Sequence, residues 1–373
     1  MSRRCNCDEQ GILSGREPIM QARQLKGLDG IRAIAIAMVL GTHLIHTRGF
    51  PEAKWLHQLL SPGTEGVTIF FVLSGFLITW LLLEEEKRSG TICLRRFFVR
   101  RAFRILPAAF FFLGFLALVG PLLGTKVIGR QLFASALFFR NVASNASGVV
   151  EDSHFWTLAI EEQFYLVWPL VFLMCRSKVR IGVAAGLVLF APLWRQFCME
   201  VWGGGNLNWF RTDLRYDPLL VGCLAALLRE KFSPNSALFG DSIGRKNVIL
   251  LTATLIFVVL TWLWSPPGWL IQATMTAKFM AIALGILVCV ELPSGLVATA
   301  LNCWPVMILG QMSYSLYLWQ QLFSLNINDR WFQVFPVNLV LTAACGCFSF
   351  FVVERFFLRI RERWFRSQSA KVG

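Results

Sequence analysis

Apolar stretches of about 20 residues, separated by short polar segments, recur from Leu28 almost to the end of this chain. A helix of about 20 apolar residues crosses a hydrocarbon core of roughly 30 Å, and a helix satisfies its own backbone hydrogen bonds there. The pattern therefore predicts an all-α, polytopic helical membrane protein with about ten transmembrane helices. The predicted spans are 28–47, 64–83, 102–123, 154–175, 180–199, 214–230, 247–264, 270–290, 303–324 and 333–356.

Basic residues are distributed unevenly between the two sets of connecting segments. If the N-terminus lies inside, the inner segments carry 21 Lys and Arg residues and the outer segments carry 7. Short cytoplasmic loops are enriched in Lys and Arg, so the bias predicts that both termini are cytoplasmic, in the cell (inner) membrane. The expected organisation is a disordered cytoplasmic tail at 1–27, a transmembrane domain at 28–356 and a basic cytoplasmic tail at 357–373.

The composition agrees with a membrane protein and excludes two other classes. Of the 373 residues 55% are hydrophobic and 16% charged, whereas soluble domains carry about 25% charged residues. The net charge of +14 lies in short strips between apolar spans, which indicates topology rather than a groove for nucleic acid. The ten cysteines fall mostly inside spans without paired metal-ligand spacing, so we expect no metal site and no structural disulfide.

The first span places two ionisable side chains at membrane depth, where such groups are costly and usually face the bundle interior. Arg32 and His43 are eleven residues apart, so they share a helix face and are separated by ~16 Å along the axis. A neutral imidazole is a ready general base or nucleophile. The alternative is that Arg32 reaches back to the interface and that His43 is a hydrogen-bonded histidine within the bundle.

Two further spans carry charges of the same kind. His154 and Glu161 are seven residues apart on one face of the fourth span, and Glu162 adds a second carboxylate. One carboxylate either pairs with an arginine to hold the bundle together, or orients an imidazole or binds hydroxyl groups. At the start of the third span, Arg101 and Arg104 suit an anion with several phosphates, although a basic strip there also anchors to anionic lipid.

Several motifs occur in order along the chain. They are Leu28–Arg32 with His43, residues 66–78, Arg101–Pro107, His154–Pro169, Arg215–Pro218 before Gly222, and Gly310–Trp319. Together these segments resemble the acyltransferase-3 family of membrane acyltransferases, whose members modify bacterial glycans and some small molecules. The chain departs from that pattern at Gln320, where members often have His, and at Phe356, where they often have Pro.

The resemblance implies an O-acyltransferase that moves an acyl group from acyl-CoA, such as acetyl-CoA, to a hydroxyl of a carbohydrate or similar acceptor. The donor is then a substrate, and no tightly bound cofactor is expected. The resemblance assigns catalytic roles to His43, Glu161 and His154. It assigns binding of the donor phosphates to Arg32, Arg101 and Arg104. Acceptor binding is assigned to Arg215, Asp217, Ser74 and Tyr314, although the hydroxyls of Ser74 and Tyr314 also suit simple helix packing.

The charged residues within the spans also fit a second class of protein. A membrane transporter or flippase of glycan precursors, without transfer chemistry, would bury arginine and glutamate in the same way. Many transporters contain repeated halves, and no repeat is visible in this sequence. A structural subunit of an envelope assembly is the third alternative. It would not explain the energetic cost of burying His and Glu side chains in the membrane.

Overall fold

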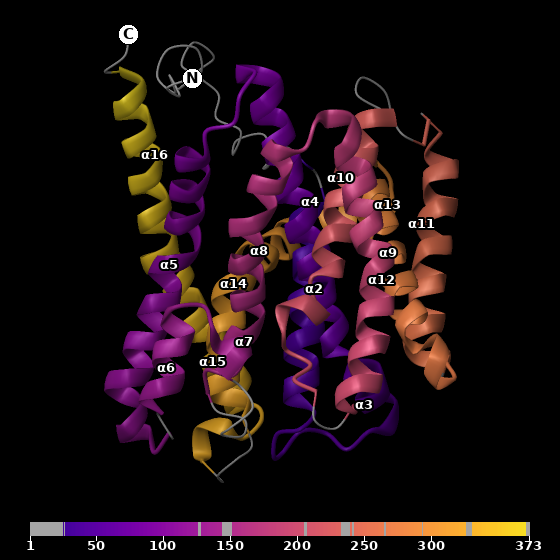
Figure 1. Cartoon of the computed structure of the whole chain (residues 1–373). Helices are drawn as coiled ribbons and strands as arrows, with labels where there is room; N and C mark the ends of the chain where they lie inside the picture. Colours follow the sequence, from indigo (N-terminus) through magenta and orange to yellow (C-terminus); the bar gives the residue numbers. More distant parts are fainter. Residues whose placement is uncertain are drawn as a thin grey trace.

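The computed structural model describes residues 25, 27–125, 128–143, 151–204, 207–232, 239–240, 242–264, 266–292, 294–325 and 330–370. All regular elements within these residues are helices, and the long ones run side by side as a bundle (Figure 1). The predicted all-α membrane fold is therefore confirmed. The predicted tail at 1–27 lies almost wholly outside the described residues.

Each of the ten predicted spans falls on a helix. The long helices are α2 (Leu28–Leu44), α4 (Gly63–Ser89), α5 (Leu94–Val119), α8 (Phe155–Met174), α9 (Ser177–Trp202), α10 (Asp217–Phe232), α11 (Ile243–Val258), α12 (Ile271–Glu291), α14 (Trp304–Ser324) and α15 (Val337–Phe348). Shorter helices connect them, namely α3 (Lys54–Leu60), α6 (Gly129–Ala136), α7 (Arg140–Ala143) and α13 (Leu296–Leu301).

Seven helices in the described part of the chain are long and apolar enough to cross a membrane. The three remaining predicted spans are α2, α10 and α14. Helix α2 has 17 residues and α10 has 16, which is fewer than the about 20 residues that cross a hydrocarbon core. Residues 217–227 of α10 are all buried, so protein surrounds this helix where lipid would surround an outer one. The count of about ten spans stays a prediction.

The central helices approach one another closely at glycines. A Cβ atom added at Gly75 of α4 would lie 1.8 Å from the Leu219 carbonyl oxygen of α10, and one at Gly222 of α10 would lie 2.0 Å from the Val72 carbonyl oxygen of α4. Such contacts leave no room for any side chain. Small residues are the usual means by which membrane helices pack backbone to backbone, and here they fix α4 against α10.

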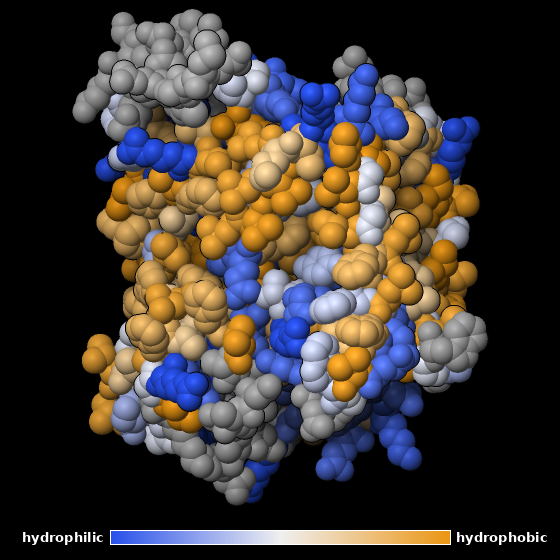
Figure 2. Space-filling view, in the orientation of Figure 1, coloured by the Kyte–Doolittle hydropathy of each residue, from blue (hydrophilic) through white to orange (hydrophobic). Residues whose placement is uncertain are grey.

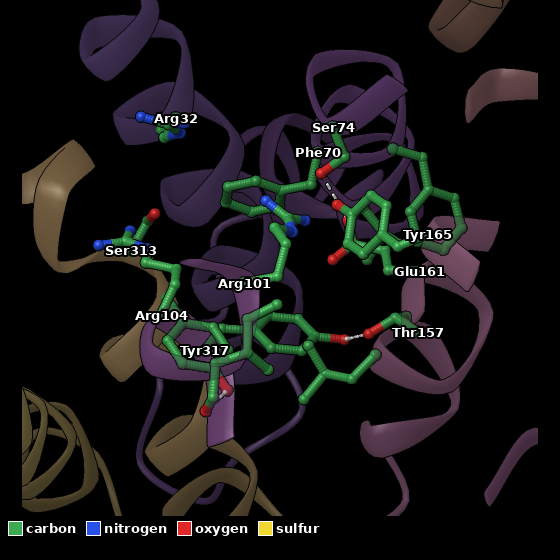
Figure 3. Close-up of a pocket in the computed structure, with 15 residues that line it drawn as sticks. Arg32, Phe70, Ser74, Arg101, Arg104, Thr157, Glu161, Tyr165, Ser313 and Tyr317 are labelled. Carbon is green, nitrogen blue, oxygen red and sulfur yellow. Dashed lines mark hydrogen bonds between the residues drawn. The ribbon is translucent and has the colours of Figure 1, made fainter. Parts of the chain in front are cut away.

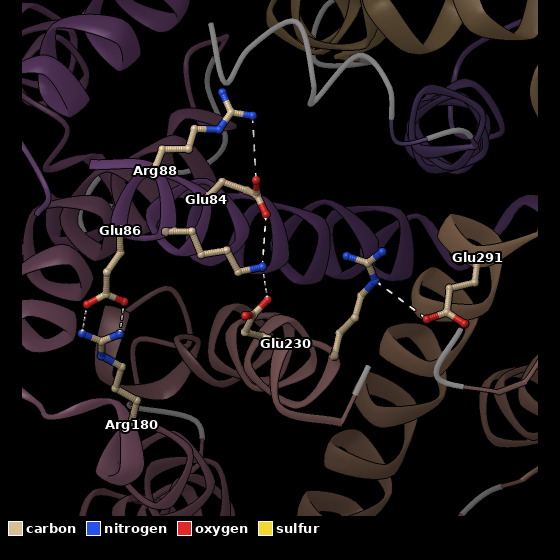
Figure 4. Close-up of polar contacts among 8 residues, drawn as sticks. Glu84, Glu86, Arg88, Arg180, Glu230 and Glu291 are labelled. Atoms are coloured by element: carbon tan, nitrogen blue, oxygen red, sulfur yellow. Dashed lines mark hydrogen bonds and ion pairs between the residues drawn. The ribbon is translucent and has the colours of Figure 1, made fainter. Parts of the chain in front are cut away.

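Ion pairs link neighbouring helices at one end of the bundle (Figure 4). Arg180 of α9 donates to both carboxylate oxygens of Glu86 on α4, at 2.6 and 2.8 Å. Lys87 of α4 contacts Glu230 of α10 at 2.6 Å. The pairs occupy the end at which α4 finishes and α16 (Arg355–Ala370) finishes (Figure 1), which is the end that the charge bias predicts to be cytoplasmic.

The last predicted span is continuous with the C-terminal helix. Helix α15 passes through a π-helical stretch, Ser349–Glu354, directly into α16. The segment predicted as a basic tail, 357–373, is therefore helical as far as residue 370. In the π-helical stretch the backbone bonds skip one more residue than in an α-helix, and Glu354 at its end is only 1% exposed.

Candidate functional site

A cavity opens at the centre of the bundle, between α2, α4, α5, α8 and α14 (Figure 3). It contains about 740 Å³ of space between atoms, including its open mouth. Side chains from all five helices line it, although these helices are far apart in sequence. Six of the ten predicted site residues are among them: Arg32, Ser74, Arg101, Arg104, Glu161 and Tyr314.

Three arginines converge on this cavity from two helices. Arg32 of α2 contacts Asp29, one turn earlier, at 2.7 Å. Arg104 of α5 contacts Glu354 at 2.5 Å, whereas Arg101 lies over the ring of Tyr165, with 3.7 Å between the guanidinium carbon and the ring centroid. Ion pairs thus hold Arg32 and Arg104, and in the described part of the chain none holds Arg101. The wall is suited to an anion that accepts several charge-assisted hydrogen bonds.

Glu354 is a member of the site that the sequence reasoning missed. Its second carboxylate oxygen accepts a hydrogen bond from the Ser315 hydroxyl at 3.1 Å, and its first contacts Arg104. A carboxylate within the apolar span 333–356 was the available signal, because charges at membrane depth generally have partners in the bundle. The residue therefore anchors α5 to the C-terminal helix beside the cavity.

The fourth predicted span presents a polar stripe to the cavity. The Ser74 hydroxyl of α4 donates to Glu161 at 2.7 Å, and the Tyr317 hydroxyl lies 2.7 Å from that of Thr157, as Figure 3 shows. Thr157, Glu161 and Tyr165 recur every four residues and so share one helix face. That spacing could have identified Thr157 and Tyr165, which the sequence reasoning did not single out.

Neither predicted catalytic histidine is among the residues that line the cavity. His154 is 3% exposed at the start of α8, where its ring packs against Phe112 and Tyr317 with centroids 5.4 Å apart in both cases. Its carbonyl oxygen accepts a hydrogen bond from the Tyr317 hydroxyl at 3.3 Å. His43 of α2 is partly buried. Tyr317 lines the cavity and contacts His154, so it connects that histidine to the cavity.

The predicted acceptor residues Arg215 and Asp217 lie outside the cavity lining. Asp217 accepts from Arg195 at 2.7 Å, and both side chains are 1% exposed. Arg195 donates in addition to Gln272 at 2.7 Å. The arginine inside the predicted span 180–199 was the signal for this pair. Arg215 instead donates from Nε to the Trp209 carbonyl oxygen at 3.1 Å, so the two predicted residues have different hydrogen-bond partners.

Comparison with known proteins identifies related sequences. A family model, acyltransferase-3, described as an acyltransferase domain, matches residues 25–354. The O-acetyltransferase OatA of Staphylococcus aureus (strain NCTC 8325 / PS 47) is 32% identical over 382 residues, which cover 94% of this chain and 59% of that protein. A putative O-acetyltransferase of Staphylococcus aureus (strain COL) is 31% identical over 323 residues, covering 80% of this chain and 50% of the relative. This chain therefore spans about three fifths or less of these relatives. No solved structure matches.

Proposed function

The chain belongs to the acyltransferase-3 family, and we propose that it is a membrane O-acetyltransferase that moves an acetyl group from acetyl-CoA to a hydroxyl group of a carbohydrate. The family match covers nearly the whole helical bundle, and the relatives are named O-acetyltransferases. The observation that carries the proposal is the convergence of Arg32, Arg101 and Arg104 on one central cavity.

The donor binds with its phosphates on the three arginines. Phosphate oxygens accept the paired N–H groups of a guanidinium in a geometry that lysine does not offer. Arg101 is the readiest to receive them, because no carboxylate is ion-paired with it in the described residues. The eleven residues from Arg32 to His43 span ~16 Å of helix, a length that an extended pantetheine arm matches. The thioester then lies toward the histidines, while the nucleotide stays near the predicted cytoplasmic side.

His43 is the catalytic residue of the proposal, and two routes are open to it. As a general base it takes the proton of the acceptor hydroxyl, whose oxygen attacks the thioester carbonyl carbon and releases the thiolate of CoA. As a nucleophile its ring nitrogen attacks the thioester carbonyl carbon and releases the thiolate of CoA; the acceptor oxygen then takes the acetyl group, and the freed imidazole takes the hydroxyl proton. His154 and Glu161 orient the reacting groups, and Ser74 holds the Glu161 carboxylate in place. Tyr314, Arg215 and Asp217 bind the acceptor.

The His43→Ala variant tests the reaction centre. The protein is purified in detergent, its folding is checked by thermal unfolding, and transfer from radiolabelled acetyl-CoA to soluble oligosaccharides is measured. We expect a folded protein without transfer activity. Undiminished transfer would remove His43 from the mechanism. A transporter needs two compartments, so transfer by the wild-type protein in detergent distinguishes the enzyme from a flippase.

The Arg32→Ala variant tests the donor site. A hydrogen bond to a charged group contributes about 1.5–3 kcal/mol, so loss of one phosphate contact raises KM for acetyl-CoA by roughly tenfold to 150-fold. Arg88→Ala is the matched control, because Arg88 is a partly exposed arginine of α4 that pairs with Glu84 and does not line the cavity. Equal KM values for the two variants would contradict the phosphate assignment.

A further inference from the structure

A hydrophilic area interrupts the apolar face of the bundle (Figure 2). It lies in the lower half of that view, where Figure 1 places α8 and the segment that joins α9 to α10. The described residues of that segment are 203–204 and 207–216, and they include the short helix Thr212–Leu214. Because lipid covers the apolar band around it, a polar area at this depth is a candidate entrance for a polar molecule.

An aromatic pair joins α8 to this segment. The rings of Trp156, on α8, and Phe210 have centroids 4.9 Å apart and are inclined by 40°. Phe210 is 38% exposed and Trp156 is partly buried. On its other side Trp156 contacts the ring of Phe71 with centroids 6.2 Å apart, and Phe71 lines the central cavity. The indole therefore separates the surface area from the cavity in which the donor is proposed to bind.

A guanidinium group with unused hydrogen-bond donors lies next to the aromatic pair. The guanidinium carbon of Arg215 is 6.0 Å from the centroid of the Trp156 ring, and its Nε donates to the Trp209 carbonyl oxygen at 3.1 Å. No ion pair with Arg215 occurs in the part of the chain that the structure describes. The nearby Arg211, in contrast, is held by both oxygens of Asp213, at 2.9 and 2.8 Å. Among the described residues the terminal nitrogens of Arg215 have no hydrogen-bond partner, so they are available to a ligand.

We infer that Trp156, Phe210 and Arg215 form the binding site for a sugar ring of the acceptor. The apolar C–H face of a sugar packs against aromatic rings, while its hydroxyl and carbonyl oxygens accept hydrogen bonds from a guanidinium group. An apolar surface with a few convergent polar groups is the usual composition of a small-molecule site. A lipid acyl chain in the same place would leave the donors of Arg215 without an oxygen acceptor.

The site rests on the proposed acetyl transfer and extends it to the acceptor. A sugar stacked on Trp156 lies against the wall of the donor cavity, because residue 157, next in the helix, lines that cavity. The acceptor hydroxyl thus approaches from the lipid-facing side of α8 while the donor occupies the interior. Trp156 and Phe210 position the acceptor in this scheme and take no part in proton transfer.

The test separates acceptor binding from donor binding. Purified wild-type protein is given radiolabelled acetyl-CoA and a panel of neutral, N-acetylated and uronic oligosaccharides, and the best-labelled sugar becomes the probe. We expect Phe210→Ala and Arg215→Gln each to raise KM for this sugar by about tenfold, as loss of a central contact does. KM for acetyl-CoA should not change, and Phe210→Trp should retain the wild-type KM for the sugar.

The matched control is Phe133→Ala, which removes a 66% exposed aromatic ring of α6 outside this area. Its kinetic constants should equal those of the wild type. If Phe210→Ala also leaves KM for the sugar unchanged while the wild type transfers acetyl groups, the sugar site is refuted and the proposed function stands. If the wild-type protein labels no oligosaccharide in the panel, the carbohydrate acceptor itself is contradicted.

Discussion

Replacing Gly222 by alanine tests whether close packing of α4 and α10 positions the cavity. The new Cβ would lie 2.0 Å from the Val72 carbonyl oxygen, where a contact of 3.4 Å is ordinary, so the two backbones must separate by about 1.4 Å. Overpacking of this kind costs about 1–3 kcal/mol, which corresponds to a fall in Tm of roughly 2–10 °C. Because Ser74 belongs to α4, its 2.7 Å hydrogen bond to Glu161 would be lost over the same displacement.

The assay is thermal unfolding in detergent, followed by measurement of acetyl transfer at a temperature where the variant is folded. Gly186→Ala is the matched control: Gly186 lies within α9, and an added Cβ would meet no atom within 4 Å. Alanine there should be neutral or stabilise by up to about 1 kcal/mol, since alanine is the better helix former. Equal Tm values for Gly222→Ala and the wild type would show that the helices tolerate separation and would refute the packing argument.

Two further predictions concern buried polar contacts. Arg195→Gln should lower the free energy of unfolding by about 3–5 kcal/mol, because the Asp217 carboxylate, 1% exposed, would be left without its partner. The double variant with Asp217→Asn should recover much of this loss in thermal unfolding. An equally unstable double variant would contradict this reasoning. Ser74→Ala should destabilise by about 1–3 kcal/mol, since Glu161 loses a hydrogen-bond donor. An unchanged Tm for that variant would show that water replaces the hydroxyl.

The length of the apolar stretches was sufficient to predict the fold class and the helices within the ten predicted spans, but not α16, whose sequence was predicted as a tail. The thickness of the bilayer sets the length of the apolar stretch in each spanning helix, and this constraint acts on each helix separately. Arg32, Arg101 and Arg104 were predicted to bind one anion, because the position of each arginine within its span fixes its depth in the membrane. All three line the same cavity in the structure. The number of spans is harder to predict, because central helices such as α10 are covered by protein and need less apolar surface.

Contacts between spans could not be predicted from spacing along one helix. Asp217 and Arg215 are two residues apart and were assigned one role, yet Asp217 pairs with Arg195 from α9 whereas Arg215 contacts Trp209. Which helix lies beside which is decided by packing, above all at glycines such as Gly75 and Gly222. The ring of Phe210 was missed for the same reason, since only the folded chain brings it to Trp156.

The π-helical stretch Ser349–Glu354 has a consequence for how this protein can change during evolution. Such a stretch holds one residue more than an α-helix of the same number of turns, so deletion of a single residue there would restore a regular helix. Helix α16 would then keep its orientation, because the number of turns before it is unchanged, and Arg104 would still face the C-terminal helix. Elsewhere in α15 or α16 each deleted residue would turn the rest of the helix by about 100°. A single deletion should therefore be tolerated better within this stretch than at other positions along the two helices.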